Sequence, residues 1–272
     1  MNDFPLGLAH LSALDLPPPQ FIRAAAKAGF ESVGLRFVAV NDVTPGYPLM
    51  SDAKMFRETK SALAETGLLV NDVEFLKFEP TTDPGSFEAL INTAAELGAK
   101  SIITAPYDED LSRLGDNLGE FADLTASKGV QTVLEFFPWT VIDDLASCWK
   151  LVQNSSEHLG ILVDSLHFNR SNSSIELLKT IPAERLPFAQ LCDAPVQESY
   201  TFDELIYAGR DERLAPGLGE IPLKEIVEAL PKCTPISLEV PQIAKTAELG
   251  EQSVLSELYK LTSHYLNQKR EQ

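Results

Sequence analysis

The stretch QTVLEFFPWTVIDDLASCWKLVQNSSEHLGILVD, residues 131–164, contains two strand-like runs with a helical segment between them. The apolar runs at residues 132–136 and 160–163 have the length and continuity of strands that are covered on both faces, and the segment between them is amphipathic. The runs end on or beside an acid, Glu135 in the first and Asp164 in the second. The stretch therefore predicts a strand–helix–strand unit of a parallel sheet with a carboxylate at each strand end.

The same alternation continues in both directions along the chain. We predict eight strands, at residues 6–9, 32–36, 69–75, 101–105, 132–136, 160–163, 188–191 and 236–240. We predict helices at residues 19–28, 52–66, 86–97, 110–127, 145–153, 222–230 and 247–266. Segments 172–174 and 194–201 are interpreted as loops that follow strands, and the second is long enough to cover an active site.

Glycines mark the joints between predicted helices and strands. Gly29, Gly67, Gly98 and Gly129 each stand just before a strand, where a left-handed residue ends the preceding helix. These joints indicate a repeated unit, and the 272 residues are close to the ~250 of a (β/α)₈ barrel. No linker or change of composition divides the chain, so we predict an α/β protein with one TIM barrel domain over residues 1–272.

Composition excludes several classes of partner. Forty Asp plus Glu against 22 Lys plus Arg give a formal charge of −18, which repels nucleic acid and anionic membrane surfaces. No apolar run approaches the ~20 residues needed to span a bilayer, and the first residues do not resemble a signal peptide. We therefore expect a soluble, cytoplasmic protein without a nucleic-acid or membrane partner. Cys148, Cys192 and Cys233 form no CxxC pair and are expected to be buried thiols.

The ends of the last four predicted strands carry oxygen ligands. They are Glu135, Asp164, Gln190 and Glu239. In a barrel of this kind the carboxyl ends of the strands face one pocket, where three carboxylates would repel each other unless a cation neutralises them. An all-oxygen set suits a hard ion, so we predict one divalent metal ion, with Mn²⁺ favoured and Mg²⁺ or Co²⁺ as alternatives. The ordinary alternative is that such acids lie at a solvated rim.

Five motifs in this order resemble the xylose isomerase-like barrel family. They are LEFFPW, VDSLHFNR, QLCDAP, RLAPGLGE and SLEVP, and the resemblance covers nearly the whole chain. This family contains sugar-phosphate isomerases and epimerases, hydroxypyruvate isomerases, inosose dehydratases and 3-dehydroshikimate dehydratases. The resemblance implies metal binding by Glu135, Asp164, Gln190 and Glu239. Many family epimerases have His where this chain has Gln190, whereas hydroxypyruvate isomerases and some dehydratases have Gln.

Further polar residues are candidates for substrate binding. The family's DxxH and R…PGxG motifs are matched by Asp164 with His167 and by Arg213 with its following loop, and both motifs usually face the substrate. His167 could equally be a core histidine, and Arg210 is a rival to Arg213. Earlier strand ends offer His10, Arg36 and Glu74 as residues that line the pocket from the far side. Asp193 is expected to support the loop after the seventh strand.

We interpret the chain as a metal-dependent isomerase or epimerase of carbohydrate metabolism that acts on a small polyhydroxy ketone or related keto-acid through an enediolate. Glu135 and Glu239 would move the proton, and His167 would assist them at the catalytic centre. A dehydratase (a lyase) of a cyclic polyhydroxy ketone, such as 3-dehydroshikimate or an inosose, and a non-catalytic sugar-binding barrel remain alternatives, and a homodimer is a possible assembly. Action on abasic DNA is disfavoured, because the chain has four histidines and a charge of −18.

Overall fold

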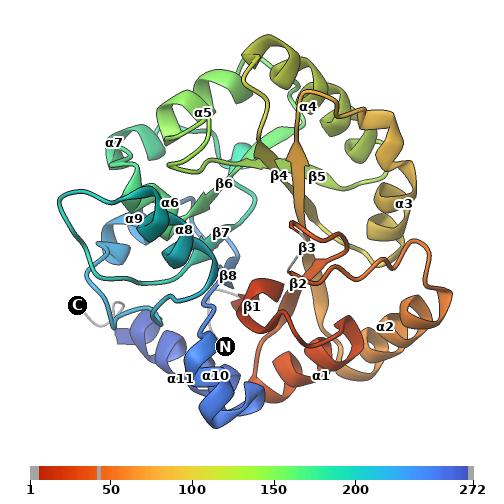
Figure 1. The fold of residues 1–272 in the computed structure, drawn as a ribbon, viewed down its shortest axis with the longest axis vertical. Helices are drawn as coiled ribbons and strands as arrows, with labels where there is room; N and C mark the ends of the chain where they lie inside the picture. Colours follow the sequence, from red (N-terminus) through yellow and green to blue (C-terminus); the bar gives the residue numbers. More distant parts are fainter. Residues whose placement is uncertain (1–5, 42–43, 269–272) are drawn as a thin grey trace.

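A closed barrel of eight parallel strands forms the centre of the protein. The computed structural model describes residues 6–41 and 44–268, and in it the strands are hydrogen-bonded in chain order, with β8 pairing back to β1 (Figure 1). The strands are β1 (Leu6–Leu8), β2 (Ser32–Arg36), β3 (Leu69–Phe78), β4 (Ser101–Pro106), β5 (Gln131–Glu135), β6 (Leu159–Asp164), β7 (Ala189–Leu191) and β8 (Ile236–Leu238). The predicted (β/α)₈ barrel is confirmed.

Helices surround the barrel (Figure 1). They are α1 (Pro18–Ala28), α2 (Ala53–Thr66), α3 (Glu88–Glu96), α4 (Leu111–Ala126), α5 (Leu145–Val152), α6 (Ser165–Arg170), α7 (Ile175–Leu178), α8 (Phe202–Arg210), α9 (Leu223–Ala229), α10 (Ile243–Leu249) and α11 (Glu251–Gln268), with 3-10 turns η1 (His10–Ala13), η2 (Pro84–Phe87) and η3 (Ala183–Arg185). The predicted helix at residues 247–266 proves to be two helices, because Gly250 has a φ of 79° that a continuous helix cannot accommodate. Within the described part of the chain, no helix is both long and apolar enough to cross a membrane.

The four joint glycines have the predicted left-handed backbone. Their φ values are 113° at Gly29, 75° at Gly67, 74° at Gly98 and 76° at Gly129. A residue with a Cβ would be strained at these positions, whereas glycine ends the helix and turns the chain toward the next strand without that cost. The repeated unit inferred from the sequence therefore has a specific backbone basis.

Side chains alternate along each strand between the barrel interior and the surrounding helices. In β6, Leu162 packs inside the barrel with Ile103, Val133 and Phe188, whereas its neighbours on the strand pack outward. The next inward position after Leu162 is Asp164, at the end of the strand. Glu135 lies two residues after the inward-facing Val133, and Gln190 lies two residues after the inward-facing Phe188. Both therefore also face the barrel interior. An apolar plug therefore closes the barrel directly below a ring of polar side chains.

The three cysteines are not all buried. Cys148 and Cys192 are, as predicted, but Cys233 is exposed. It lies in the turn between α9 and β8, where its backbone has a φ of 64°. The prediction of a third buried thiol was therefore wrong, because residue type alone does not reveal the conformation of a turn.

Candidate functional site

The ends of β5 to β8 bring the four predicted metal ligands to one rim. Glu135 and Asp164 end their strands, Gln190 is the middle residue of β7, and Glu239 follows β8 directly. Asp164 is the ladder partner of Gln190, so these two lie at the same level of the barrel. All four residues are at most 7% exposed, which is unusual for acids.

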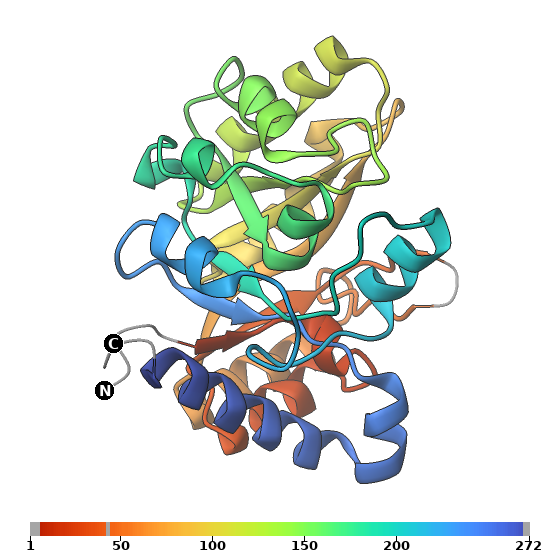
Figure 2. The same cartoon turned by 90° about the vertical axis from the view of Figure 1, so that its left-hand side faces the viewer.

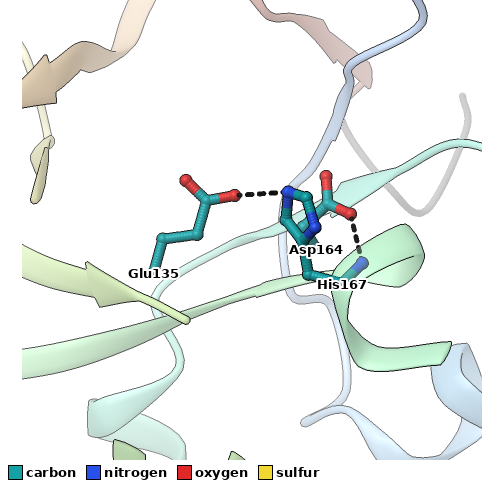
Figure 3. A group of neighbouring side chains, drawn as sticks. All are labelled: Glu135, Asp164 and His167. Carbon is teal, nitrogen blue, oxygen red and sulfur yellow. Dashed lines mark hydrogen bonds and ion pairs between the residues drawn. The ribbon is translucent and has the colours of Figure 1, made fainter. Parts of the chain in front are cut away.

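Glu135, Asp164 and His167 form a close group of side chains that could ligate a metal ion. One donor atom from each lies within 4.8 Å of the others (Figure 3). Asp164 caps α6, because its Oδ1 accepts hydrogen bonds from the backbone N–H groups of Leu166 and His167 at 2.7 and 3.1 Å. The cap holds His167 in place, with Nε2 at 3.7 Å from Oε1 of Glu135. This group adds His167 to the residues that could hold an ion.

Arg213 pairs with two of the four predicted ligands. Its Nη1 lies 2.7 Å from Oδ2 of Asp164, and its Nη2 lies 3.0 Å from Oε2 of Glu239. The guanidinium is 1% exposed, so both ion pairs lie away from water. When all three buried carboxylates are ionised, one guanidinium leaves an excess of two negative charges, which matches the charge of one divalent cation.

Two polar atoms in this group have no hydrogen-bond partner among the described residues. They are Oε1 of Gln190 and Nδ1 of His167. Both are buried, where an unpaired acceptor costs about 1–3 kcal/mol. An amide oxygen is a ligand for hard ions such as Mn²⁺ or Mg²⁺, and an imidazole nitrogen is a ligand for zinc. The chemistry of the set therefore fits a metal ion.

The carboxylates perturb one another electrostatically. Burial, followed by the charges of Glu239 and Asp164, raises the pKa of Glu135 well above its ordinary value. Burial also raises the pKa of Glu239, to about 7, with Arg213 opposing the rise. Burial alone would raise the pKa of Asp164 too, but Arg213 and His167 bring it below its ordinary value. The site therefore carries its negative charge on Asp164 first and holds protons that a cation would displace.

His167 lies between the acids and an aromatic wall. Its ring centroid is 4.7 Å from that of Phe137 and 5.1 Å from that of Trp139, with both contacts edge-on. Burial lowers the pKa of His167 to about 4, against the attraction of Asp164. The imidazole is therefore neutral near pH 7 and can act as a ligand or as a hydrogen-bond partner for substrate.

A cavity of about 620 Å³ opens over the site. Glu135, His167, Arg213 and Glu239 line its floor, and the aromatic side chains of Phe75, Tyr107, Phe137 and Trp139 line one wall. Its rim comes from η1, from the loop after β2, from α8 and from the segment after β8. Figure 2 shows α8, in blue-green, at the end of the barrel toward which the strand arrows point. The volume suits a small-molecule substrate.

Arg36 at the end of β2, Glu74 on β3 and His10 at the start of η1 form a second polar group. Nη2 of Arg36 lies 2.9 Å from Oε2 of Glu74, and Arg36 lines the cavity. Both ring nitrogens of His10 are engaged, because Nδ1 accepts from the backbone N–H of Arg36 and Nε2 bonds to the carbonyl of Leu16, each at 2.9 Å. His10 is fully buried and stacks between the rings of Phe21 and Tyr47, so it does not line the cavity as predicted. The structure therefore places Arg36 at the cavity, whereas His10 fixes the backbone of Arg36.

Sequence reasoning missed a buried acid below Glu74. Asp72 is fully buried, and its Oδ1 has no partner in the described portion of the chain. Burial and the charge of Glu74 raise its pKa well above the ordinary value. The signal was present, because two acids spaced two apart on a strand must face the same side. Asp193, by contrast, does support its loop, accepting hydrogen bonds from the backbone N–H groups of Ala194, Gly217 and Ile221 at 2.9–3.0 Å.

Known proteins resemble this chain over most of its length. Residues 22–256 match the family described as xylose isomerase-like TIM barrel. Inosose isomerase of Bacillus subtilis (strain 168) is 25% identical over 53% of the chain, and 3-dehydroshikimate dehydratase of Pseudomonas aeruginosa is 26% identical over 82%. The alignments span 54% and 36% of those two relatives. Among solved structures, the IolI protein with a bound zinc atom has a TM-score of 0.80 at 18% identity, covering 98% of this chain and 99% of IolI.

Proposed function

The chain belongs to the xylose isomerase-like TIM barrel family, and on that premise we propose that it is a divalent-metal-dependent isomerase or epimerase of a small hydroxy-ketone. The observation that carries the proposal is the set of three buried carboxylates that face one guanidinium and the unpartnered amide oxygen of Gln190. A buried excess of negative charge of this kind is stabilised most directly by a cation. The isomerase among the relatives supports the reaction class.

Glu135, Asp164, Gln190 and Glu239 would hold the ion, and His167 is a further donor beside them. The oxygen-rich set favours Mn²⁺ over Mg²⁺ or Co²⁺, while His167 gives zinc a ligand that it prefers. A bound divalent cation would supply Lewis acidity there, which makes a carbon-bound proton beside a carbonyl group more acidic. Proton transfer and substrate orientation would be carried out by the protein's own side chains.

Glu135 and Glu239 are the proposed acid and base. Burial raises the pKa of both carboxyl groups in the metal-free protein, to about 7 for Glu239. A cation would lower these pKa values and leave the carboxylates ionised, which is the form that accepts a proton from carbon. They stand on β5 and directly after β8, so they reach the substrate from different directions. A proton taken by one and returned by the other epimerises a carbon, and a proton returned to the adjacent carbon isomerises the ketone.

The aromatic wall and the polar far side would orient the substrate. Phe137 and Trp139 offer apolar faces to the C–H groups of a polyol, and His167 presents its imidazole between them and the acids. Arg36 reaches the cavity from the opposite side, fixed by Glu74. A small ring or a short chain that carries hydroxyl groups at several positions would find partners along the whole cavity.

Dehydration is the second candidate function. The alignment with 3-dehydroshikimate dehydratase covers 82% of this chain, against 53% for inosose isomerase. The same enediolate expels water when a hydroxyl group stands on the next carbon, so the proposed acid and base serve either outcome. A catalytically silent sugar-binding barrel is the remaining alternative.

Proton exchange separates these candidates. The protein, loaded with Mn²⁺, is incubated in deuterated water with a panel of keto-sugars, inososes and 3-dehydroshikimate, and carbon-bound deuterium is followed by NMR. Deuterium incorporation without loss of water supports an isomerase or epimerase, and loss of water supports the dehydratase. Bound Mn²⁺ without any exchange would contradict both enzymes. Glu135→Gln should abolish the exchange, whereas Glu157→Gln, an exposed site, is the matched control.

A further inference from the structure

Arg213 connects the candidate metal ligands to the roof of the cavity. Besides its ion pairs with Asp164 and Glu239, its Nη1 donates to the backbone carbonyl of Glu239 at 3.2 Å. Its Nε and Nη2 donate to the carbonyls of Ala208 and Gly209 at 3.2 and 2.9 Å. One rigid guanidinium thus binds two carboxylates and the last turn of α8 at the same time.

Helix α8 packs closely enough on the cavity wall to act as its roof. A Cβ at Gly209 would lie 2.9 Å from the ring of Trp139, so only glycine allows this approach. Ile206, Gly209 and Arg210 of the same helix line the cavity. The position of α8 therefore decides how much of the cavity is covered. The side chain of Arg213 binds the carbonyls of the last turn of α8. The segment directly after the helix is held by backbone bonds from Arg213 to Pro241 and from Ile243 to Asp211, and by the bond from the Ala244 N–H to Glu212.

A metal ion and Arg213 require the same carboxylate oxygens. Oδ1 of Asp164 is occupied by the two backbone N–H groups at the start of α6, so Oδ2 is the oxygen left for an ion, and Arg213 binds it at 2.7 Å. At Glu239, Oε1 accepts from Gln190 and Oε2 pairs with Arg213. A cation on these oxygens withdraws charge from them and repels the guanidinium, so its bonds weaken as the ion binds.

We propose that Arg213 is a positioning residue that couples metal occupancy of the site to the attachment of α8. Without the ion, Arg213 serves as the counter-cation of Asp164 and Glu239 and fastens the roof. When the ion is bound, the guanidinium loses its ion pairs with the carboxylates, and its hydrogen bonds to the carbonyls of Ala208 and Gly209 weaken. Helix α8 then becomes more mobile and can admit substrate. This inference rests on the proposed metal site, but the attachment of α8 in the metal-free protein does not.

Amide hydrogen exchange of residues 202–212 tests the coupling directly. In the metal-free protein, Arg213→Gln should accelerate exchange of these amides at least about tenfold, because local opening becomes easier when the attachment is lost. In the unsubstituted protein, Mn²⁺ should accelerate exchange in the same segment, and in Arg213→Gln it should add nothing. Arg210→Gln is the matched control on the same helix, and its exchange should stay within about twofold of the unsubstituted protein.

Mn²⁺ affinity, measured by titration calorimetry, separates the effect of the positive charge of Arg213 from the effect of its planar guanidinium shape. Arg213→Gln removes a competing cation and should tighten Mn²⁺ binding about tenfold. Arg213→Lys restores the charge but not the planar fork, so it should return the affinity toward the unsubstituted value while α8 continues to exchange rapidly. Full rescue of both properties by lysine would overturn a role for the guanidinium geometry.

The outcomes separate failure of this inference from failure of the proposed function. If the unsubstituted protein binds no Mn²⁺, Mg²⁺, Co²⁺ or Zn²⁺, the metal site is wrong, and exchange in metal-free Arg213→Gln still decides whether Arg213 fastens α8. If the protein binds Mn²⁺ but exchange at residues 202–212 does not respond, or slows, the coupling is wrong and the metal site stands. Weaker Mn²⁺ binding by Arg213→Gln would also overturn it.

Discussion

Nε2 of Gln190 lies 3.3 Å from Oε1 of Glu239 and donates a hydrogen bond to it, while the amide oxygen of Gln190 has no hydrogen-bond partner among the residues that the structure describes. The two residues come from neighbouring strands, and both are almost fully buried. Fixing the amide nitrogen on Glu239 sets the direction of the oxygen. This orientation of the oxygen is what the proposed role of Gln190 as an oxygen ligand to a cation requires.

Replacing Gln190 with histidine should change which metal the site prefers. An imidazole nitrogen favours Zn²⁺ over Mn²⁺ more strongly than an amide oxygen does, so the ratio of the two affinities should rise about tenfold or more in Gln190→His. Competitive equilibrium dialysis with both ions measures this ratio. Gln131→His, at the opposite end of the barrel, is the control. An unchanged ratio would show that Gln190 does not contact the ion.

Replacing Asp164 with asparagine should abolish tight metal binding. Asparagine keeps an oxygen to cap α6, so the local fold should survive, but the site loses its most readily ionised carboxylate. We expect Mn²⁺ affinity to fall more than about 100-fold, beyond what loss of an outer partner costs. Metal analysis after dialysis gives the result, with Asp116→Asn on the surface of α4 as the comparison. Retention of one ion per chain would place the metal elsewhere.

His10 should make the protein less stable in acid. Burial lowers its pKa from 6.5 to about 3, so between these values the unfolded chain binds a proton that the folded protein does not. Stability is then complete above pH 6.5 and falls as the pH drops, by about 1.4 kcal/mol per pH unit from this residue. Glutamine can replace both hydrogen bonds without titrating.

Urea unfolding at pH 7.5, 6.5 and 5.5 compares the free energy of unfolding of the unsubstituted protein, His10→Gln and His158→Gln. In His10→Gln the number of protons taken up on unfolding at pH 5.5 should be nearly one smaller than in the unsubstituted protein. In His158→Gln, at an exposed position, this number should be unchanged. Identical slopes for all three proteins would mean that His10 is not held neutral in the folded protein.

Adding a methyl group to Gly209 should disturb the cavity more than the fold. The new Cβ would stand 2.9 Å from the Trp139 ring, so α8 or the ring must move. Because α8 is anchored at the rim, we expect a loss of about 1–2 kcal/mol in unfolding free energy, within the usual range for overpacking, and a larger change in KM than in kcat. Gly115→Ala on α4, where a Cβ meets no neighbour, is the control. Unchanged KM would argue against α8 as the roof.

The barrel and its rim of acids could be predicted because they depend on local patterns. Continuous apolar runs, glycines at helix ends and the two-residue alternation of strands are each set by backbone geometry within a few residues. Once the strands are parallel and closed, Glu135, Asp164, Gln190 and Glu239 must meet at one end, since every strand ends there. The sequence by itself therefore determined the architecture and the polar ring.

Only the tertiary structure decided how the loops complete that ring. Arg213 stands 49 positions from Asp164, and its pairing with that carboxylate depends on the path of the chain through α8. His10 is held by backbone contacts with Arg36 and Leu16, which no spacing rule specifies, and the complete burial of Asp72 is set by the packing around β3. Such contacts arise from long-range packing, where many chain paths satisfy the same local pattern and the folded arrangement alone selects one.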